Sequence, residues 1–208
     1  MSTKVKICGI TNVADAEMAV AAGADMLGFI FHGQSRRFVA LPLLAEITRN
    51  LPPAVLRVGV FVNAPEDFVL QAARAGGLNL LQFHGEEPPE YCAQFGLMSI
   101  KAFRVSDESS LLDLPRYGTD AWLLDAYTPG VQGGTGQRFD WDLAVKARDQ
   151  GKPIFLAGGL TPENVAEAVT KVRPFAVDVS SGVEQSPGKK DPAKVQAFIN
   201  NVRQASMS

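Results

Sequence analysis

Short strand-like apolar runs alternate along the whole chain with longer segments of helical character. The runs fall at residues 5–8, 26–31, 56–62, 80–83, 99–103, 122–124, 154–157 and 176–179. This pattern predicts eight strands, each followed by a connection long enough to hold a helix. A chain of 208 residues leaves about 26 residues for each strand-helix unit, close to the smallest length that holds both elements.

Helix start and stop signals lie in the connections. Asn12 precedes the segment VADAEMAVAA, and Gly23 follows it. Thr161-Pro162-Glu163 is predicted to open a later helix, and Asp191-Pro192 the last one. The fifth connection, residues 106–120, is polar and interrupted by Pro115, so we expect a short or irregular helix there.

Strict alternation of strand and helix favours a parallel sheet with right-handed crossovers, and eight such units most often close into a barrel. The alternative is an open doubly wound sheet. No G-x-G-x-x-G fingerprint follows an early strand, which favours the barrel. We therefore predict an α/β protein with one domain over residues 1–208, a (β/α)8 TIM barrel with a short or irregular fifth helix.

Composition excludes several function classes. The formal charge is −2 with Lys and Arg scattered along the chain, so nucleic acid is not an expected partner. Two cysteines and two histidines form no zinc pattern. No apolar run approaches a membrane span, and the N-terminus does not read as a signal peptide, so we expect neither membrane insertion nor secretion. Reduced thiols in the cytoplasm fit this sequence best.

In a (β/α)8 barrel, the active site is built at the carboxyl ends of the strands. Clusters of Gly, Ser and Thr follow strands six, seven and eight, where backbone N–H groups commonly bind phosphate. The candidate phosphate-binding residues are Gly134, Thr135, Gly136, Gly158, Gly159, Ser180, Ser181 and Gly182. Taken singly, each cluster could be an ordinary strand-to-helix turn. Three successive clusters favour an anion site.

Two side chains at strand ends are candidates for proton transfer. Cys8 ends the first strand with the same parity as Lys6, which points it inward if Val5 and Ile7 face the helices. Asp125 ends the apolar run AWLLDA, and such surroundings can raise the pKa of a carboxyl group. The alternatives are a small buried thiol and a helix-capping carboxylate. The two strands are three steps apart around the ring, so both side chains can face each other across the barrel mouth.

Further candidates lie after the second and fourth strands. Arg36 and Arg37 offer guanidinium groups suited to a carboxylate, although either could simply be solvated. His84 is a histidine at the rim, either a substrate contact or a structural group.

Several of these segments together resemble the phosphoribosylanthranilate isomerase family of tryptophan biosynthesis. They are KICGIT, GADMLGFIFHGQSRRFV, VGVFVN, LQFHGEE, WLLDAYTPGVQGGTGQRFDW, LAGGLTPENV and VRPFAVDVSSGVEQSPGKKD. The resemblance extends from the first strand to the start of the last helix. The first and last of these segments are the most specific.

The resemblance implies an Amadori rearrangement of N-(5-phosphoribosyl)anthranilate without metal or organic cofactor. It implies that Cys8 is the general base, that Asp125 is the general acid and that Arg37 binds the anthranilate carboxylate. The glycine- and serine-rich loops match the phosphate-binding elements of the family, and His84 and Asp178 are further candidate substrate contacts. Asp178 could instead pair with Lys6. The family often has Pro or Lys where Arg36 stands here.

Competing functions remain at this point. Indoleglycerol-phosphate synthase would be expected to offer a lysine acid and an extra N-terminal helix, and an aminoimidazole ribonucleotide isomerase an aspartate in place of Cys8. Neither feature is seen. A catalytically silent barrel that binds a phosphorylated ligand or a partner subunit is the alternative from another class. The expected partner is a small phosphosugar, and the oligomeric state is left open between monomer and homodimer.

Overall fold

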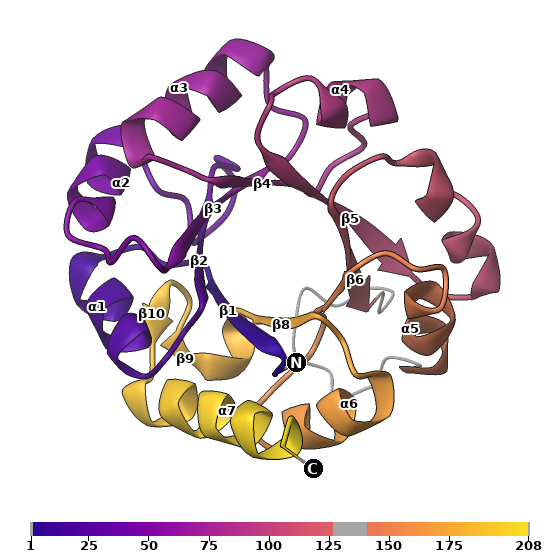
Figure 1. Cartoon of the computed structure of the whole chain (residues 1–208). Coiled ribbons are helices and arrows are strands. Elements are labelled where there is room, and N and C mark those ends of the chain that lie inside the picture. The colour runs from indigo at the N-terminus through magenta and orange to yellow at the C-terminus, as the bar shows by residue number, and fades with distance from the viewer. Residues whose placement is uncertain (1, 127–140, 208) are drawn as a thin grey trace.

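The chain forms a closed barrel of eight parallel strands in sequence order, with helices packed around it (Figure 1). The computed structural model describes residues 2–126 and 141–207. The barrel strands are β1 (Lys4–Cys8), β2 (Met26–Ile30), β3 (Leu56–Phe61), β4 (Leu80–Phe83), β5 (Met98–Val105), β6 (Ala121–Ala126), β7 (Ile154–Leu156) and β8 (Ala176–Val179). Pairing of β8 with β1 closes the ring and rules out the open doubly wound sheet. The predicted strands and barrel are confirmed.

The α-helices of the described residues follow the predicted order. They are α1 (Val13–Ala21), α2 (Leu41–Thr48), α3 (Glu66–Gly76), α4 (Pro89–Ala93), α5 (Trp141–Arg148), α6 (Val165–Val172) and α7 (Pro192–Ala205). Asn12 caps α1 by accepting a hydrogen bond from the Asp15 N–H, and Asp191 caps α7. The helix predicted to open at residues 161–163 begins at Val165, because the Asn164 side chain accepts from the Thr161 N–H in a preceding turn.

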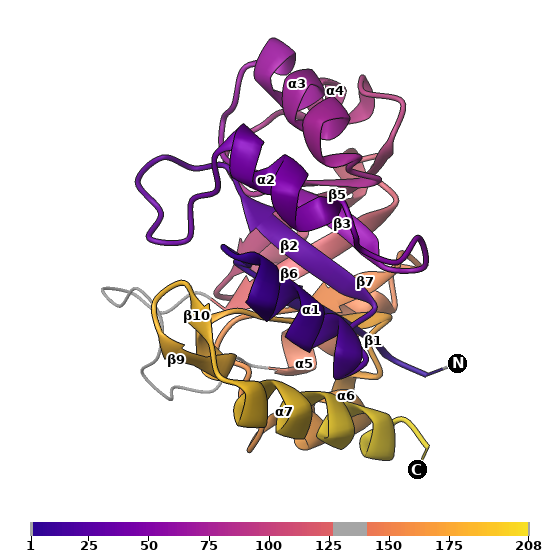
Figure 2. The same cartoon turned by 90° about the vertical axis from the view of Figure 1, so that its left-hand side faces the viewer.

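The connection between β5 and β6 holds two short 3-10 helices, η1 (Glu108–Leu111) and η2 (Leu114–Arg116). This confirms the irregular fifth helix. The connection after β8 differs from expectation, since it holds a third 3-10 helix, η3 (Ser181–Val183), and a hairpin of β9 (Glu184–Ser186) and β10 (Lys189–Lys190). In Figure 2 this hairpin lies at the same end of the barrel as the loop between β2 and α2, opposite the chain termini.

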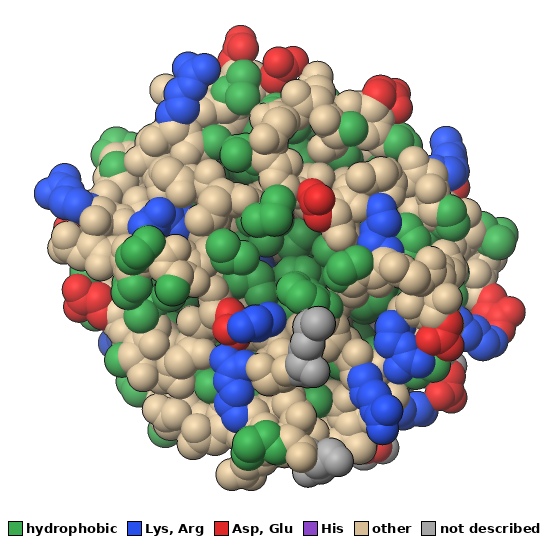
Figure 3. All heavy atoms as spheres, viewed as in Figure 1, with side chains coloured by type: hydrophobic (Ala, Val, Ile, Leu, Met, Phe, Trp, Pro, Cys, Tyr) green, Lys and Arg blue, Asp and Glu red, His purple; other side chains and the backbone are tan. Residues whose placement is uncertain are grey.

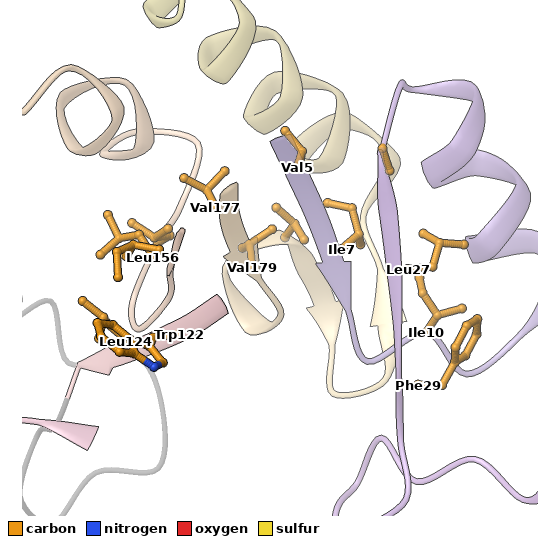
Figure 4. Close-up of a cluster of buried hydrophobic side chains, with 14 of the residues drawn as sticks. Val5, Ile7, Ile10, Leu27, Phe29, Trp122, Leu124, Leu156, Val177 and Val179 are labelled. Atoms are coloured by element: carbon orange, nitrogen blue, oxygen red, sulfur yellow. The ribbon is translucent and has the colours of Figure 1, made fainter. Parts of the chain in front are cut away.

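Alternation along each strand divides the core into two layers. Outward residues such as Val5, Ile7 and Leu124 pack against the helices (Figure 4). Inward residues such as Leu123 and Phe155 fill the barrel. Beyond this apolar filling, polar side chains occupy inward positions at the carboxyl ends of the strands. In a barrel of this type, the functional site lies at that end.

The opposite end of the barrel is more apolar. Figure 3 looks onto the face that carries the N-terminal ends of the strands, where apolar side chains gather around the centre. Met98, which begins β5, and Phe175, which precedes β8, are each about half exposed. Charged groups surround this centre, among them Asp25, which pairs with Lys4 and Arg203. In the described part of the chain, no helix has both the length and the apolar character to span a bilayer.

Candidate active site

Cys8 lies inside the barrel at the carboxyl end of β1. Its side chain points inward with that of Lys6, as the strand parity predicted. Both residues are buried, and the Lys6 ammonium pairs with the Asp178 carboxylate on β8 at 2.9 Å. Gly28, the β2 neighbour of Cys8, makes room for them, because a Cβ atom there would lie 2.7 Å from the Cys8 Sγ and 2.9 Å from the Lys6 Nζ.

Burial raises the pKa of the Cys8 thiol, because the interior disfavours the thiolate. The charge of Lys6 acts in the opposite direction, with a smaller contribution from Lys190, whereas Asp178 adds to the increase. The thiol of this structure is therefore protonated at neutral pH. Lys6 is the strongest of the groups that favour its ionisation.

Asp125 is the last but one residue of β6, on an inward position, and its side chain is one-third exposed. Among the described residues, Asp125 pairs with His84, whose Nε2 lies 3.4 Å from the Asp125 Oδ2. The Nδ1 of the same imidazole lies 2.9 Å from the Nε2 of Gln82, a buried residue on β4. An amide N–H directed at Nδ1 places the imidazole proton on Nε2, facing Asp125. His84 is thus placed against the candidate acid.

Arg37 reaches the same mouth from the loop after β2. Its Nε and Nη2 donate hydrogen bonds of 2.8 and 2.7 Å to the two carboxylate oxygens of Glu184. The side chain passes over Gly9, where a Cβ atom would lie 2.6 Å from the Arg37 Cδ. Arg36, by contrast, is exposed. The geometry distinguishes the two arginines that the sequence left side by side.

The candidate phosphate loops after β7 and β8 touch each other. Gly158 and Gly159 both have positive φ, 80° and 68°, which favours glycine there. Gly182 lies against the β7 loop so closely that a Cβ atom would be 2.0 Å from the carbonyl oxygen of Leu160. The Ser180 hydroxyl is buried without a hydrogen-bond partner among the described residues. Ser181 opens η3. The third candidate cluster, Gly134, Thr135 and Gly136, lies outside the described residues.

A second buried carboxylate organises the loops next to His84. Glu87 accepts hydrogen bonds from the backbone N–H groups of Asn63 and Gly85 at 2.7 and 2.9 Å. Lys101 on β5 donates to it at 3.0 Å and is itself buried. This cluster ties the loops after β3 and β4 to β5, and so supports the segment that carries His84.

Sequence reasoning missed Glu184, Lys190 and Gln82 as parts of the site. The first two flank the turn in GVEQSPGKKD, and the opposite charges on either side of a Ser-Pro-Gly turn were the available signal for a hairpin. Gln82 is an inward polar residue in an apolar strand, two positions before His84. Such a residue is expected to have a polar partner.

A family model and several relatives match nearly the whole chain. The family model for N-(5′-phosphoribosyl)anthranilate isomerase matches residues 5–201. An N-(5′-phosphoribosyl)anthranilate isomerase from Citrifermentans bemidjiense is 56% identical over 205 residues, covering 99% of each chain. The crystal structure of phosphoribosyl anthranilate isomerase from Thermotoga maritima superimposes with a TM-score of 0.91 at 45% identity, over 97% of this chain and 99% of that one.

A further solved structure contains a ligand. It is a phosphoribosyl anthranilate isomerase in complex with reduced 1-(o-carboxyphenylamino)-1-deoxyribulose 5-phosphate, with a TM-score of 0.87 and 42% identity. The match covers 97% of this chain and 99% of that one.

Proposed function

The chain belongs to the N-(5′-phosphoribosyl)anthranilate isomerase family, and we propose that Cys8 is its general base and Asp125 its general acid. The protein is an isomerase of tryptophan biosynthesis, an aldose-ketose isomerase acting on a small phosphosugar. The observation that carries the residue assignment is the placement of a buried thiol beside an ammonium on β1 and of a histidine-paired carboxylate on β6, both inward at the carboxyl rim.

The proposed reaction begins at the sugar ring. Asp125 gives a proton to the furanose ring oxygen, the bond from that oxygen to C1 breaks, and the nitrogen lone pair forms an iminium. His84, held by Gln82 with its Nε2 proton toward Asp125, orients the carboxyl group for this transfer.

Proton removal follows at C2. The iminium acidifies the C2 proton and favours loss of the Cys8 thiol proton to solvent. The thiolate then takes the C2 proton, and the electrons of the C–H bond give an enolamine. Tautomerisation moves a proton to C1 and leaves a ketone at C2, the 1-(2-carboxyphenylamino)-1-deoxyribulose 5-phosphate product. Lys6 lowers the pKa that burial raises for Cys8, and the positive iminium of the bound intermediate acts in the same direction.

The substrate is held at both anionic ends. Arg37 binds the anthranilate carboxylate, and the loops with Gly158, Gly159 and residues 180–182 bind the phosphate, together with Gly134, Thr135 and Gly136. Support comes from the contact between the two described loops and from the Ser180 hydroxyl, which has no hydrogen-bond partner among the described residues. His84 and Asp178 stay proposed substrate contacts, although the Asp178 carboxylate is already bound to Lys6.

The proposal also covers the ligand class, the assembly, the domain organisation and the cellular location. The ligand is a small phosphosugar and the assembly a monomer or a dimer, as related structures include a phosphoribosylanthranilate isomerase described both as a dimer and as generated monomers. We propose one domain over residues 1–208 and a cytoplasmic location, where both cysteines would stay free thiols as they are here.

The test compares Cys8→Ser and Asp125→Asn with Cys92→Ser, a change at the other buried cysteine, which lies on α4. Turnover is followed by the loss of fluorescence of phosphoribosylanthranilate. Each site variant is expected to lose ~10²–10⁴-fold in kcat, which is on the order of 3–5 kcal/mol of transition-state stabilisation, and to fold normally. Near-normal kcat in folded Cys8→Ser would remove Cys8 from the mechanism. A wild-type protein that binds the reduced analogue without turnover would instead be a silent binding barrel.

A further inference from the structure

Glu184 is a buried carboxylate near the site that takes no part in the proposed proton transfers. It begins β9, its side chain is 5% exposed, and both of its oxygens accept hydrogen bonds from Arg37. Burial alone would raise the pKa of Glu184, but the hydrogen bonds from Arg37 and the charge of Lys190 outweigh burial and hold it below the ordinary value. The carboxylate is therefore ionised at neutral pH.

The hairpin holds this carboxylate from behind. Lys190 is the cross-strand neighbour of Glu184, and its buried ammonium lies 2.9 Å from the Glu184 Oε1. The same ammonium donates to the Ser180 carbonyl oxygen at 3.2 Å, and the N–H of Gly188 in the hairpin turn also points at Oε1, at 3.3 Å. Because the Lys190 ammonium and the Gly188 N–H hold the carboxylate in addition to Arg37, Glu184 is a fixed anchor rather than a mobile counter-ion.

The pairing with Arg37 uses one edge of the guanidinium group. A guanidinium has five N–H donors, and Nε with one N–H of Nη2 satisfies Glu184. The opposite edge, formed by Nη1 and the second N–H of Nη2, has the spacing to bind a second carboxylate with two parallel hydrogen bonds. Glu184 and a ligand carboxylate thus do not compete for the same edge.

We propose that Glu184 is a positioning residue that fixes the guanidinium of Arg37 so that its outer edge receives the aromatic carboxylate of the substrate. Glu184 balances the charge of Arg37, so recognition depends on the orientation of the donors more than on net charge. Gly9 contributes by leaving the path over β1 open for the arginine stem. The inference rests on the proposed role of Arg37.

Two variants of Glu184 test the proposal. Glu184→Gln removes the charge and one acceptor. Glu184→Asp keeps the negative charge beside Lys190 but is one methylene too short to bind both Nε and Nη2 of Arg37. This variant tests the proposal if Glu184→Gln fails to fold. The control is Asp25→Asn, since Asp25 also binds an arginine and a lysine, Arg203 at 2.6 Å and Lys4 at 3.0 Å, at the opposite end of the barrel.

The measurement is calorimetric binding of two ligands. The first is reduced 1-(o-carboxyphenylamino)-1-deoxyribulose 5-phosphate, and the second is its phenylamino counterpart without the carboxylate. Both Glu184 variants should bind the first ligand about ten- to hundredfold more weakly, the range expected for charged hydrogen bonds, and the second ligand as wild type does. Asp25→Asn should bind both ligands normally.

Equal weakening of both ligands would show a merely structural role for Glu184 and overturn the proposal, as would unchanged binding of both. Arg37→Ala separates this failure from that of the proposed function. If Arg37→Ala loses the preference for the carboxylate and the Glu184 variants keep it, only the positioning role is wrong. If Arg37→Ala keeps the preference, the assigned role of Arg37 and the positioning role both fail.

Discussion

Gly28→Ala is a one-methyl perturbation aimed at the contact between Cys8 and Lys6. Gly28 lies on β2 beside Cys8, and its φ is not in the left-handed region, so alanine meets no backbone penalty there. The added Cβ would lie 2.7 Å from the Cys8 Sγ, 2.9 Å from the Lys6 Nζ and 3.1 Å from the Cys8 Cα. The new methyl group would therefore displace the thiol, the ammonium or both.

The size of the effect follows from these distances. Ordinary contact begins at 3.4 Å, so the Cys8 Sγ must move by about 0.7 Å or rotate away. Misplacing a reacting group by ~1 Å can cost ~10²-fold in rate, and overpacking a core costs ~1–3 kcal/mol. We expect kcat to fall about 10²-fold and the free energy of unfolding to fall by ~1–3 kcal/mol.

The control variant introduces a similar steric clash away from the candidate active site. In Gly59→Ala on β3, the added Cβ would lie 2.6 Å from a Leu78 methyl and 2.7 Å from the Phe61 ring, in the layer between sheet and helices. Both variants should be destabilised in thermal or urea unfolding, and only Gly28→Ala should lose kcat per folded molecule. Equal kcat in the two variants would refute the claim that the thiol position above Gly28 matters for catalysis.

Two more outcomes follow from the site. Lys6→Met removes the main group that opposes the effect of burial on the Cys8 pKa, so that pKa should rise further. Because the proposed base and the thiol that is alkylated both react as thiolate, kcat/KM and the rate of Cys8 alkylation should then increase only at higher pH than in wild type. An alkylation profile at the wild-type pH would contradict this. Gly182→Ala puts a Cβ atom 2.0 Å from the Leu160 carbonyl oxygen, so it should separate the two loops, lower the free energy of unfolding in urea by ~1–3 kcal/mol and raise KM. Gly118→Ala is the control and should have none of these effects, because the added Cβ would meet no described residue within 4 Å other than its chain neighbours.

The barrel could be predicted because its signal repeats locally. Each strand is an apolar run, several connections carry helix start or stop signals, and strand parity then orients Lys6 and Cys8 inward. The sequence also allowed the pairing of Lys6 with Asp178, because a closed barrel makes β1 and β8 neighbours. The broken connection after β5 was readable from its Pro and its polar residues.

The hairpin after β8 could not be predicted in the same way. Its strands are three and two residues long, too short for a periodic pattern, and one of them contains a register shift. The pairing that anchors it, Arg37 with Glu184, joins residues 147 positions apart. The choice between Arg36 and Arg37 depends on that distant carboxylate, so local sequence alone leaves both arginines equivalent.

The charges around the thiol explain why the order of the two proton transfers matters. The groups that interact with Cys8 or with its immediate partners are the cations Lys6, Arg37 and Lys190 and the carboxylates Asp178 and Glu184. They sum to one positive charge, which a thiolate would neutralise. On the proposed binding mode, a substrate carboxylate on Arg37 removes that surplus, so binding alone disfavours the thiolate. Ring opening restores it, because the iminium adds one positive charge inside the site. On the proposed mechanism, the acid step at Asp125 therefore comes first and creates the field in which Cys8 can act as a base.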